Sequence, residues 1–236
     1  MGSNEFLGYI SCALNEQNKK MKYEINRKKD VSGPHNQDVL SVLFGTLLGD
    51  ASYLEKKMNK SRIHLQQESQ NQEYLNWLHS FFASKGYCSS VKPKMSVRIC
   101  SKTNKLRWVL RVRTYSFASL NWLIDCFYFE GVKSVPKQEQ LTKYLTPLAL
   151  AIWFCDCKES SGKGLKISTN CFTKMDIERL CDFLYAHYGI FSKPNKNGFC
   201  KKKKRLYCLY IHSKSLDDFR NLIKPFMVNS MHYKLK

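Results

Sequence analysis

Residues 42–51 read VLFGTLLGDA, and residues 148–157 read LALAIWFCDC. Both runs are apolar and free of charge until an acidic residue near the C-terminal end. Small residues interrupt the large ones, at Gly45, Gly49, Ala149 and Ala151. Small side chains let two helix backbones approach closely, so the runs are predicted to be two similar helices that allow such an approach. Either run alone is typical of a buried core helix, and both are shorter than the roughly 20 apolar residues that span a bilayer.

The two runs resemble the LAGLIDADG motifs of the homing endonuclease and maturase family. The first run fits the motif, with Asp50 at its final acidic position. The second run fits up to Asp156 and then departs, because Cys157 stands at the final acidic position and Lys158 replaces the small residue after it. The chain from about residue 37 to residue 236 resembles the single-chain members of the family, which carry two motifs.

Hydrophobic periodicity predicts the same order of elements in both halves, namely helix, two strands, helix, two strands and helix. The first motif helix is predicted to end near Asp50 with Asp38 as its cap, and residues 131–144 are predicted to link the halves. Gly86 and Gly189 are predicted to end helices. The other expected helices span residues 72–85, 119–128, 174–187 and 216–223, and the strands span 51–55, 62–67, 91–99, 106–113, 165–169, 191–193 and 205–212.

This order predicts an α+β fold of two pseudo-symmetric αββαββα repeats. We expect a basic N-terminal extension over residues 1–36, a first repeat over 37–136 and a second over 137–236. The extension is compatible with a flexible arm, a phosphate-binding segment or a targeting remnant. The resemblance implies a pseudo-dimeric monomer, with the motif helices packed at the centre. It also implies that two antiparallel sheets form a concave, nucleic-acid-binding saddle.

The chain of 236 residues carries 39 lysines and arginines against 19 aspartates and glutamates, a net charge of +20 at pH 7. Such an excess repels itself in the compact state. A polyanion relieves that repulsion, so RNA or double-stranded DNA is the expected partner. A solvated basic surface is the alternative. The ten cysteines lack the paired spacing of zinc sites, and no secretory or membrane-spanning segment is visible, so no membrane partner is expected.

Basic and polar residues alternate along the strands predicted for the saddle, with few aspartates or glutamates among them. Such a ribbon fits a major groove, where Arg, Lys and Gln side chains read base edges. The alternative, a strand with a merely solvated face, predicts mixed charge. The candidate nucleic-acid-binding residues are Arg62, His64, Gln66, Lys92, Lys94, Arg98, Arg107, Arg111, Arg113, Lys163, Lys166, Ser168, Lys193, Lys196, Lys203 and Arg205.

The resemblance also implies a catalytic centre, in which each motif supplies one aspartate for Mg²⁺ and a lysine follows each repeat. The candidate metal ligands are Asp50 and Asp156, and together with Lys133 and Lys234 they are the candidate catalytic residues. A plain surface lysine is the alternative for both lysines. Mg²⁺ prefers oxygen ligands, whereas the thiolate of Cys157, at the expected ligand position, suits softer metals. One half-site is therefore predicted to be damaged.

The primary hypothesis is a nucleic-acid-binding protein of homing-endonuclease descent, in which double-strand cleavage is impaired or lost and no cofactor is needed. It would act as an RNA-binding splicing cofactor, or with other proteins as a structural component of an organellar ribonucleoprotein such as a ribosome. The alternative is an active, site-specific, Mg²⁺-dependent DNA homing endonuclease, and a third reading is a basic globular protein without these activities. The resemblance implies an organellar location, the mitochondrion before the chloroplast.

Overall fold

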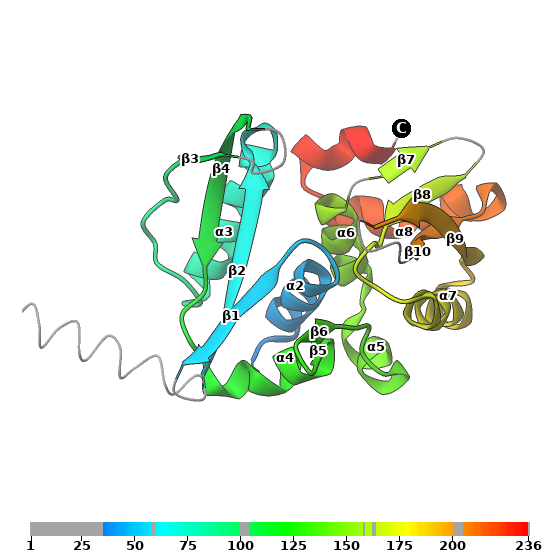
Figure 1. Cartoon of the computed structure of the whole chain (residues 1–236), viewed down its shortest axis with the longest axis horizontal. Helices are drawn as coiled ribbons and strands as arrows, with labels where there is room; N and C mark the ends of the chain where they lie inside the picture. Colours follow the sequence, from blue (N-terminus) through cyan, green and yellow to red (C-terminus); the bar gives the residue numbers. More distant parts are fainter. Residues whose placement is uncertain are drawn as a thin grey trace, which may run out of the picture.

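The computed structural model describes residues 35–57, 60–99, 104–157, 159–161, 164–200 and 205–235. It shows two mixed helix-and-sheet halves, with one helix of each half, α2 and α6, in contact at the centre (Figure 1). Lys158, Lys163, Lys203 and residues 1–34 of the predicted extension lie outside the described residues. None of the helices in the described ranges is both long enough and apolar enough to cross a membrane.

The first half is built on a four-stranded antiparallel sheet with the strand order β1-β2-β4-β3. Helices α3 and α4 pack against one face of this sheet, and no helix of the described ranges packs against the other. The elements are α2 (Gln37–Leu48), β1 (Ser52–Lys57), β2 (Lys60–Glu68), α3 (Gln72–Ser84), β3 (Ser96–Ile99), β4 (Leu106–Arg113), α4 (Asn121–Phe127), β5 (Tyr128–Phe129) and β6 (Val132–Lys133).

The second half repeats this plan, with a four-stranded antiparallel sheet in the equivalent order β7-β8-β10-β9 and helix α7 against its inner face. The predicted pair of αββαββα repeats is therefore confirmed. The elements are α5 (Gln138–Tyr144), α6 (Pro147–Asp156), β7 (Glu159–Ser161), β8 (Leu165–Ser168), α7 (Lys174–Tyr188), β9 (Ser192–Phe199), β10 (Arg205–Ile211), α8 (Leu216–Ile223) and the terminal 3-10 helix η5 (Asn229–Leu235).

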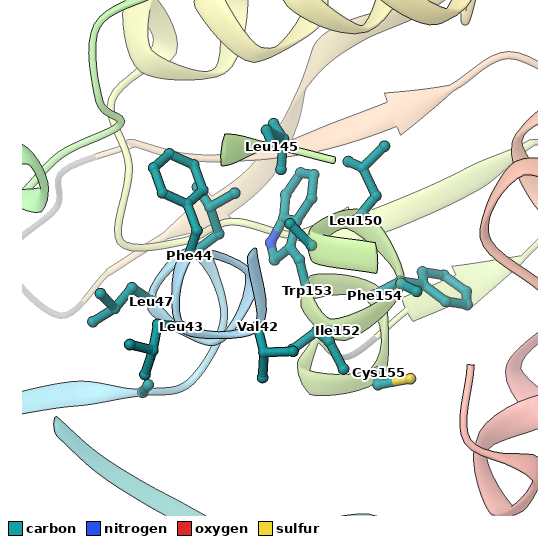
Figure 2. Close-up of a cluster of buried hydrophobic side chains, with 14 of the residues drawn as sticks. Val42, Leu43, Phe44, Leu47, Leu145, Leu150, Ile152, Trp153, Phe154 and Cys155 are labelled. Atoms are coloured by element: carbon teal, nitrogen blue, oxygen red, sulfur yellow. The ribbon is translucent and has the colours of Figure 1, made fainter. Parts of the chain in front are cut away.

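The two motif helices form the centre of the core. Residues 39–48 of α2 and residues 149–156 of α6 are all buried, as expected for helices that are apolar on every side. Figure 2 shows side chains from both helices, among them Phe44 and Trp153, in one buried cluster. A Cβ added at Gly45 would overlap the carbonyl oxygen of Ala149. Gly45, Gly49 and Ala149 therefore lie where the two backbones meet, whereas Ala151 is buried in α6.

Two close contacts between α2 and α6 define the register of the repeat. Gly45 faces Ile152, Gly49 faces Asp156, and the partners in both pairs are 107 residues apart. A two-fold axis brings equivalent residues of the two halves face to face. A shift of 107 residues therefore relates the halves at the axis, and it makes Cys157 the equivalent of Asp50.

Helix ends show where the local predictions hold and where they fail. Gly86 and Gly189 follow α3 and α7 with φ of 77° and 66°, the left-handed conformation that favours glycine. The predicted cap Asp38 is wrong, because Asn36 is the N-cap residue and its side chain accepts a hydrogen bond from the backbone N–H of Asp38 at 2.8 Å. Asp38 instead lies in the first turn of the helix, where a negative charge is favourable.

Several segments differ between the prediction and the structure, among them β9, which spans Ser192–Phe199 instead of residues 191–193. The predicted strand over residues 91–99 is paired only from Ser96 onward, because Pro93 lacks an N–H group for a sheet ladder. The predicted linker over residues 131–144 contains the end of a two-stranded hairpin and the helix α5. Strand β7 was not predicted at all, since three polar residues carry no periodic signal.

We predict that Gly45→Ala destabilises the protein, although alanine is favoured over glycine in helix interiors by about 1 kcal/mol. The new methyl group would overlap the backbone carbonyl of Ala149, which has no rotamer to change. The expected loss is about 1–3 kcal/mol, measured as the shift of the urea midpoint. Ser80→Ala, on the exposed side of α3, is the control for helix propensity alone. If both variants gained stability, the close helix contact would be refuted.

Candidate functional site

The candidate carboxylates lie where the central helices end. Asp50 follows the last residues of α2, and Asp156 is the final residue of α6. A Cβ added at Gly49 would lie 2.5 Å from Cβ of Asp156, so the two helix ends touch. Asp50, Asp156 and Gln66 line one narrow crevice. The structure therefore brings together the two aspartates that the motifs predicted and one residue of the predicted saddle.

Asp156 is held inside the protein by the first repeat. Its side chain is buried, and its Oδ1 accepts a hydrogen bond of 3.0 Å from Nε2 of Gln67. The side chain of Asn71 donates in turn to Oε1 of Gln67 at 3.1 Å, and the hydroxyl of Tyr74 lies beside the carboxyl group. Burial, reinforced by the negative charge of Asp50, raises the pKa of Asp156 to about 8. At neutral pH this carboxyl group is largely protonated.

Asp50 is in a different environment. Its side chain remains exposed, yet the surrounding chain removes enough water to raise its pKa, while the positive charges of Lys133 and Lys234 lower it in part. Desolvation disfavours the ionised carboxylate and nearby cations favour it. Asp50 is therefore the exposed acidic group of the crevice, next to two cations.

The two lysines are tied to the helix ends. Nζ of Lys133 donates to the carbonyl oxygens of Gly49 at 2.8 Å and Ala51 at 3.3 Å. Nζ of Lys234 donates to the carbonyl oxygens of Cys155 at 2.9 Å and Cys157 at 2.6 Å. A helix leaves its last carbonyls without partners and carries partial negative charge at that end. Each lysine therefore satisfies the end of the motif helix in its own repeat.

These donors do not suit a pair of Mg²⁺ ions. Cys157 is buried, and burial raises the pKa of its thiol well above the ordinary range, so it presents a neutral sulfur. The carboxyl of Asp156 is protonated and engaged with Gln67, which leaves Asp50 as the single hard ligand of the two motifs. The described ranges contain no group of three His, Cys, Asp or Glu residues suited to a metal ion. The second half-site does not fit the ion.

The first sheet presents a mainly cationic face on the side away from α3 and α4, interrupted by Glu68, which forms an ion pair with Arg107 at 2.7 Å. Arg62, His64 and Gln66 alternate with buried residues along β2. Arg113 pairs with His64 and Arg111 with Gln66 across the ladder, and Arg98 pairs with Arg107 at its end. Seven of the predicted residues therefore share one face, namely Arg62, His64, Gln66, Arg98, Arg107, Arg111 and Arg113.

Several groups on this face are arranged to receive a partner. Nε of Arg111 donates to Oε1 of Gln66 at 2.8 Å, which orients both side chains. Nε of Arg62 and Nε2 of His64 are shielded from water and make no hydrogen bond within the described structure. Burial and then the charges of Arg113 and Arg111 lower the pKa of His64, so this face carries a positive potential. Unsatisfied polar atoms in such a field point to a polar, anionic partner.

The second sheet presents a smaller polar face. Lys166 and Ser168 lie on β8 opposite Tyr210 and Cys208 of β10, and Lys193 pairs with Tyr210 from the other side. The ammonium group of Lys193 lies 5.8 Å from the centroid of the Tyr210 ring. Tyr210 was missed by the prediction, because the alternation of residues in β10 shows its face only once the pairing partners are known.

Four predicted binding residues lie elsewhere. Lys92 and Lys94 are in the loop before β3, not in a strand. Lys196 pairs with Tyr207, which packs against the core, so it is on the opposite side of the sheet from Lys193. Arg205 is two residues before Tyr207 on the same strand, so its side chain is on the same face of the sheet as Tyr207. Its guanidinium carbon lies 4.8 Å from the centroid of the Phe199 ring. Periodicity alone could not place Lys196 and Arg205, since the β9–β10 register shifts within the hairpin.

Comparison with known proteins gives consistent matches. The profile of the LAGLIDADG DNA endonuclease family matches residues 40–219. Cytochrome b mRNA maturase bI2 of Saccharomyces cerevisiae is 36% identical over 230 residues, which cover 92% of this chain and 53% of that protein. The maturase bI2 of Debaryomyces hansenii is 36% identical over 203 residues, which cover 86% of this chain and 75% of that protein. The chain thus spans about half the length of the S. cerevisiae relative.

One solved structure has the same fold. The homing endonuclease I-WcaI, bound to its DNA recognition sequence, superposes with a TM-score of 0.76 and covers 92% of both chains. The sequence identity is 23%, so this likeness bears on the fold alone. The two apolar runs predicted a similarity to endonucleases and maturases that carry this motif, and the comparisons confirm it.

We predict that Asp156→Asn makes stability less dependent on pH. The pKa of Asp156 in the folded state is raised to about 8, above its value in the unfolded chain. The wild-type protein should therefore lose stability as pH rises from about 4 to about 8, by at most about 1.4 kcal/mol per pH unit. The variant escapes this loss, so its advantage in urea unfolding should grow with pH.

The control is Asp182→Asn on the exposed side of α7, whose difference from the wild type should stay constant over the same range. Parallel stability curves for Asp156→Asn and the wild type would show that the carboxyl of Asp156 is not held in its protonated form.

Proposed function

We propose a function from the premise that the chain belongs to the LAGLIDADG DNA endonuclease family. It binds nucleic acid through its two open sheet faces, serves as an RNA-binding splicing cofactor, and has lost efficient double-strand cleavage. The observation that carries this proposal is the inequality of the two helix ends. Asp50 is exposed beside two lysines, whereas its counterpart Cys157 is a buried, neutral thiol.

Binding relies on charge and on pre-oriented side chains. The cations of the first sheet lie on one face and contact phosphates, which gives affinity without reading sequence. Arg111 and Gln66, already hydrogen-bonded to each other, offer donors and acceptors to base edges. In the second sheet, Lys166 and Lys193 supply charge and Tyr210 offers a ring for contact with bases or sugars. The net charge of +20 supports a polyanionic partner.

Cleavage of both strands would need two competent centres, one for each strand. Endonucleases of the family generally use a divalent metal ion, and oxygen ligands hold Mg²⁺ far better than sulfur does. Asp156 does not replace the missing ligand, because its carboxyl is buried against Gly49 and Gln67. The chain is therefore proposed to keep the binding surface and to lack the second catalytic centre.

The alternative function is a DNA endonuclease that cuts or nicks one strand. Asp50 with Lys133 and Lys234 nearby favours it, as does the structural likeness to an endonuclease bound to DNA. The maturases at 36% identity favour the splicing cofactor instead. A role within a larger organellar ribonucleoprotein is a further version of the same proposal. Because the two yeast relatives are named as maturases of cytochrome b mRNA, we propose the mitochondrion as the location.

We predict that the triple variant Arg111→Gln, Arg113→Gln, Lys166→Gln binds RNA more weakly and with a smaller salt dependence. Each lost phosphate contact should reduce the slope of log K against log[salt] by about 0.7 to 0.9. The measurement is equilibrium binding to intron RNA and to duplex DNA between low and physiological salt. Lys85→Gln, at the end of α3 on the helix side of the first sheet, is the matched control. An unchanged slope would place the nucleic acid on another surface.

We also predict that the wild-type chain shows little or no double-strand cleavage when it is incubated with Mg²⁺ and a library of duplex sites. The double change Cys157→Asp, Lys158→Gly restores the motif pattern in the second repeat and should add metal-dependent cleavage. Asp50→Asn in that background should remove cleavage of the strand that depends on the first repeat. Efficient double-strand cleavage by the wild type would contradict the loss of function proposed here.

A further inference from the structure

The outer edge of the first sheet carries a cavity of about 380 Å³ that the binding proposal leaves unused. It lies between β4 and the chain that runs from Cys88 to Ser96. Because β3 begins at Ser96, it pairs with β4 only as far as Val109. In the described structure no strand covers the edge of β4 over residues 110–113 on that side. The cavity is the space between this bare edge and the loop.

The loop that closes the cavity is fixed at both ends. Nε2 of His79 in α3 donates to the carbonyl oxygen of Ser89 at 2.8 Å. At the other end, the hydroxyl of Ser96 donates to the carbonyl oxygen of Val109 at 3.3 Å. The backbones of Cys88 and Thr114 pair in an isolated antiparallel β-bridge at the end of the cavity. The space is therefore held open by the fold before any partner arrives.

The lining divides into an apolar part and a cationic part. Val91, Pro93 and Val112 form apolar walls, and Lys94, Arg111 and Arg113 bring three positive charges; the lining contains no carboxylate. A bare strand edge also presents backbone N–H and C=O groups to whatever lies beside it. A ligand that matches must be planar or compact and partly apolar, must hydrogen-bond along one edge, and must carry an anionic group.

We propose that this cavity holds one unpaired nucleotide of the bound nucleic acid. Its base lies against the apolar wall and the bare edge of β4, and its phosphate contacts Lys94, Arg111 and Arg113. The inference rests on the proposed function, since Arg111 and Arg113 also belong to the open cationic face. It refines that function, because unpaired bases are available in the loops and bulges of structured RNA, whereas duplex DNA must first be unpaired.

The first test follows the valine methyl groups of the full chain by NMR during titration with AMP. The methyls of Val91 and Val112, which line the cavity, should shift, while those of Val97, which is on β3 and outside the lining, should not. AMP should act at lower concentration than inorganic phosphate or adenosine alone. Equal effects of phosphate and AMP would mean an anion site, and unmoved cavity methyls would mean no site; either result overturns the proposal.

Two lysines of the same loop provide a matched pair of variants. Lys94 lines the cavity and Lys92 does not, although both are exposed. Lys94→Gln should weaken AMP binding about tenfold, as expected for the loss of a charge-assisted contact, and Lys92→Gln should leave it unchanged. Equal weakening by both variants would show that general charge, rather than the cavity, holds the nucleotide.

A second measurement separates this inference from the proposed function. The full chain is titrated with a short RNA duplex and with the same duplex carrying one bulged nucleotide. We expect tighter binding to the bulged RNA, and we expect Lys94→Gln, but not Lys92→Gln, to abolish that preference. Equal affinity of the wild type for both RNAs would overturn the nucleotide site while the proposed function stands. Binding to neither RNA nor duplex DNA would overturn the proposed function itself.

Discussion

The close approach of α2 and α6 is the constraint on which the rest of the structure depends. It requires a residue without a side chain at Gly45, where the neighbour is a backbone carbonyl that cannot move aside. It fixes the two-fold relation of the repeats, and so it decides which residues meet at the helix ends. The same contact seals Asp156 against Gly49 and away from solvent. The geometry that joins the two halves thereby removes one of the two motif aspartates from the chemistry.

Burial has opposite consequences on the two sides of the axis. In the first repeat the carboxyl group of Asp50 stays exposed next to two lysines, so an oxygen ligand remains available at the crevice. In the second repeat it keeps a carboxyl and a thiol neutral, which suits the low dielectric of the core. The two open sheet faces do not differ in this way, because both carry positively charged side chains. The proposed binding surface and the candidate catalytic groups therefore lie in different layers of the same fold, so a change in one need not change the other.

Much of the fold could be predicted because its signals are local. The apolar runs, the helix-ending glycines and the alternation of Arg62, His64 and Gln66 each reflect the period of one element. The roles of Asp156 and Lys196 could not be predicted in this way. The burial of Asp156 depends on Gln67, which is 89 residues away in the other repeat, and the side on which Lys196 lies depends on the pairing of β9 with β10. The cap at Asn36 instead of Asp38 shows that even a local signal can misplace a helix start by two residues.

Lys133 and Lys234 have a consequence that reaches beyond this chain. Each donates to two carbonyl oxygens at the end of its own motif helix, and so it stabilises the fold whether or not any strand is cut. Selection for stability alone would preserve both lysines after selection for cleavage had ended. In this fold, a surviving lysine is weak evidence of a working enzyme. Cys157 caps its helix through backbone atoms, which any residue would supply, so the identity of the side chain at this position is the better record of what selection has kept.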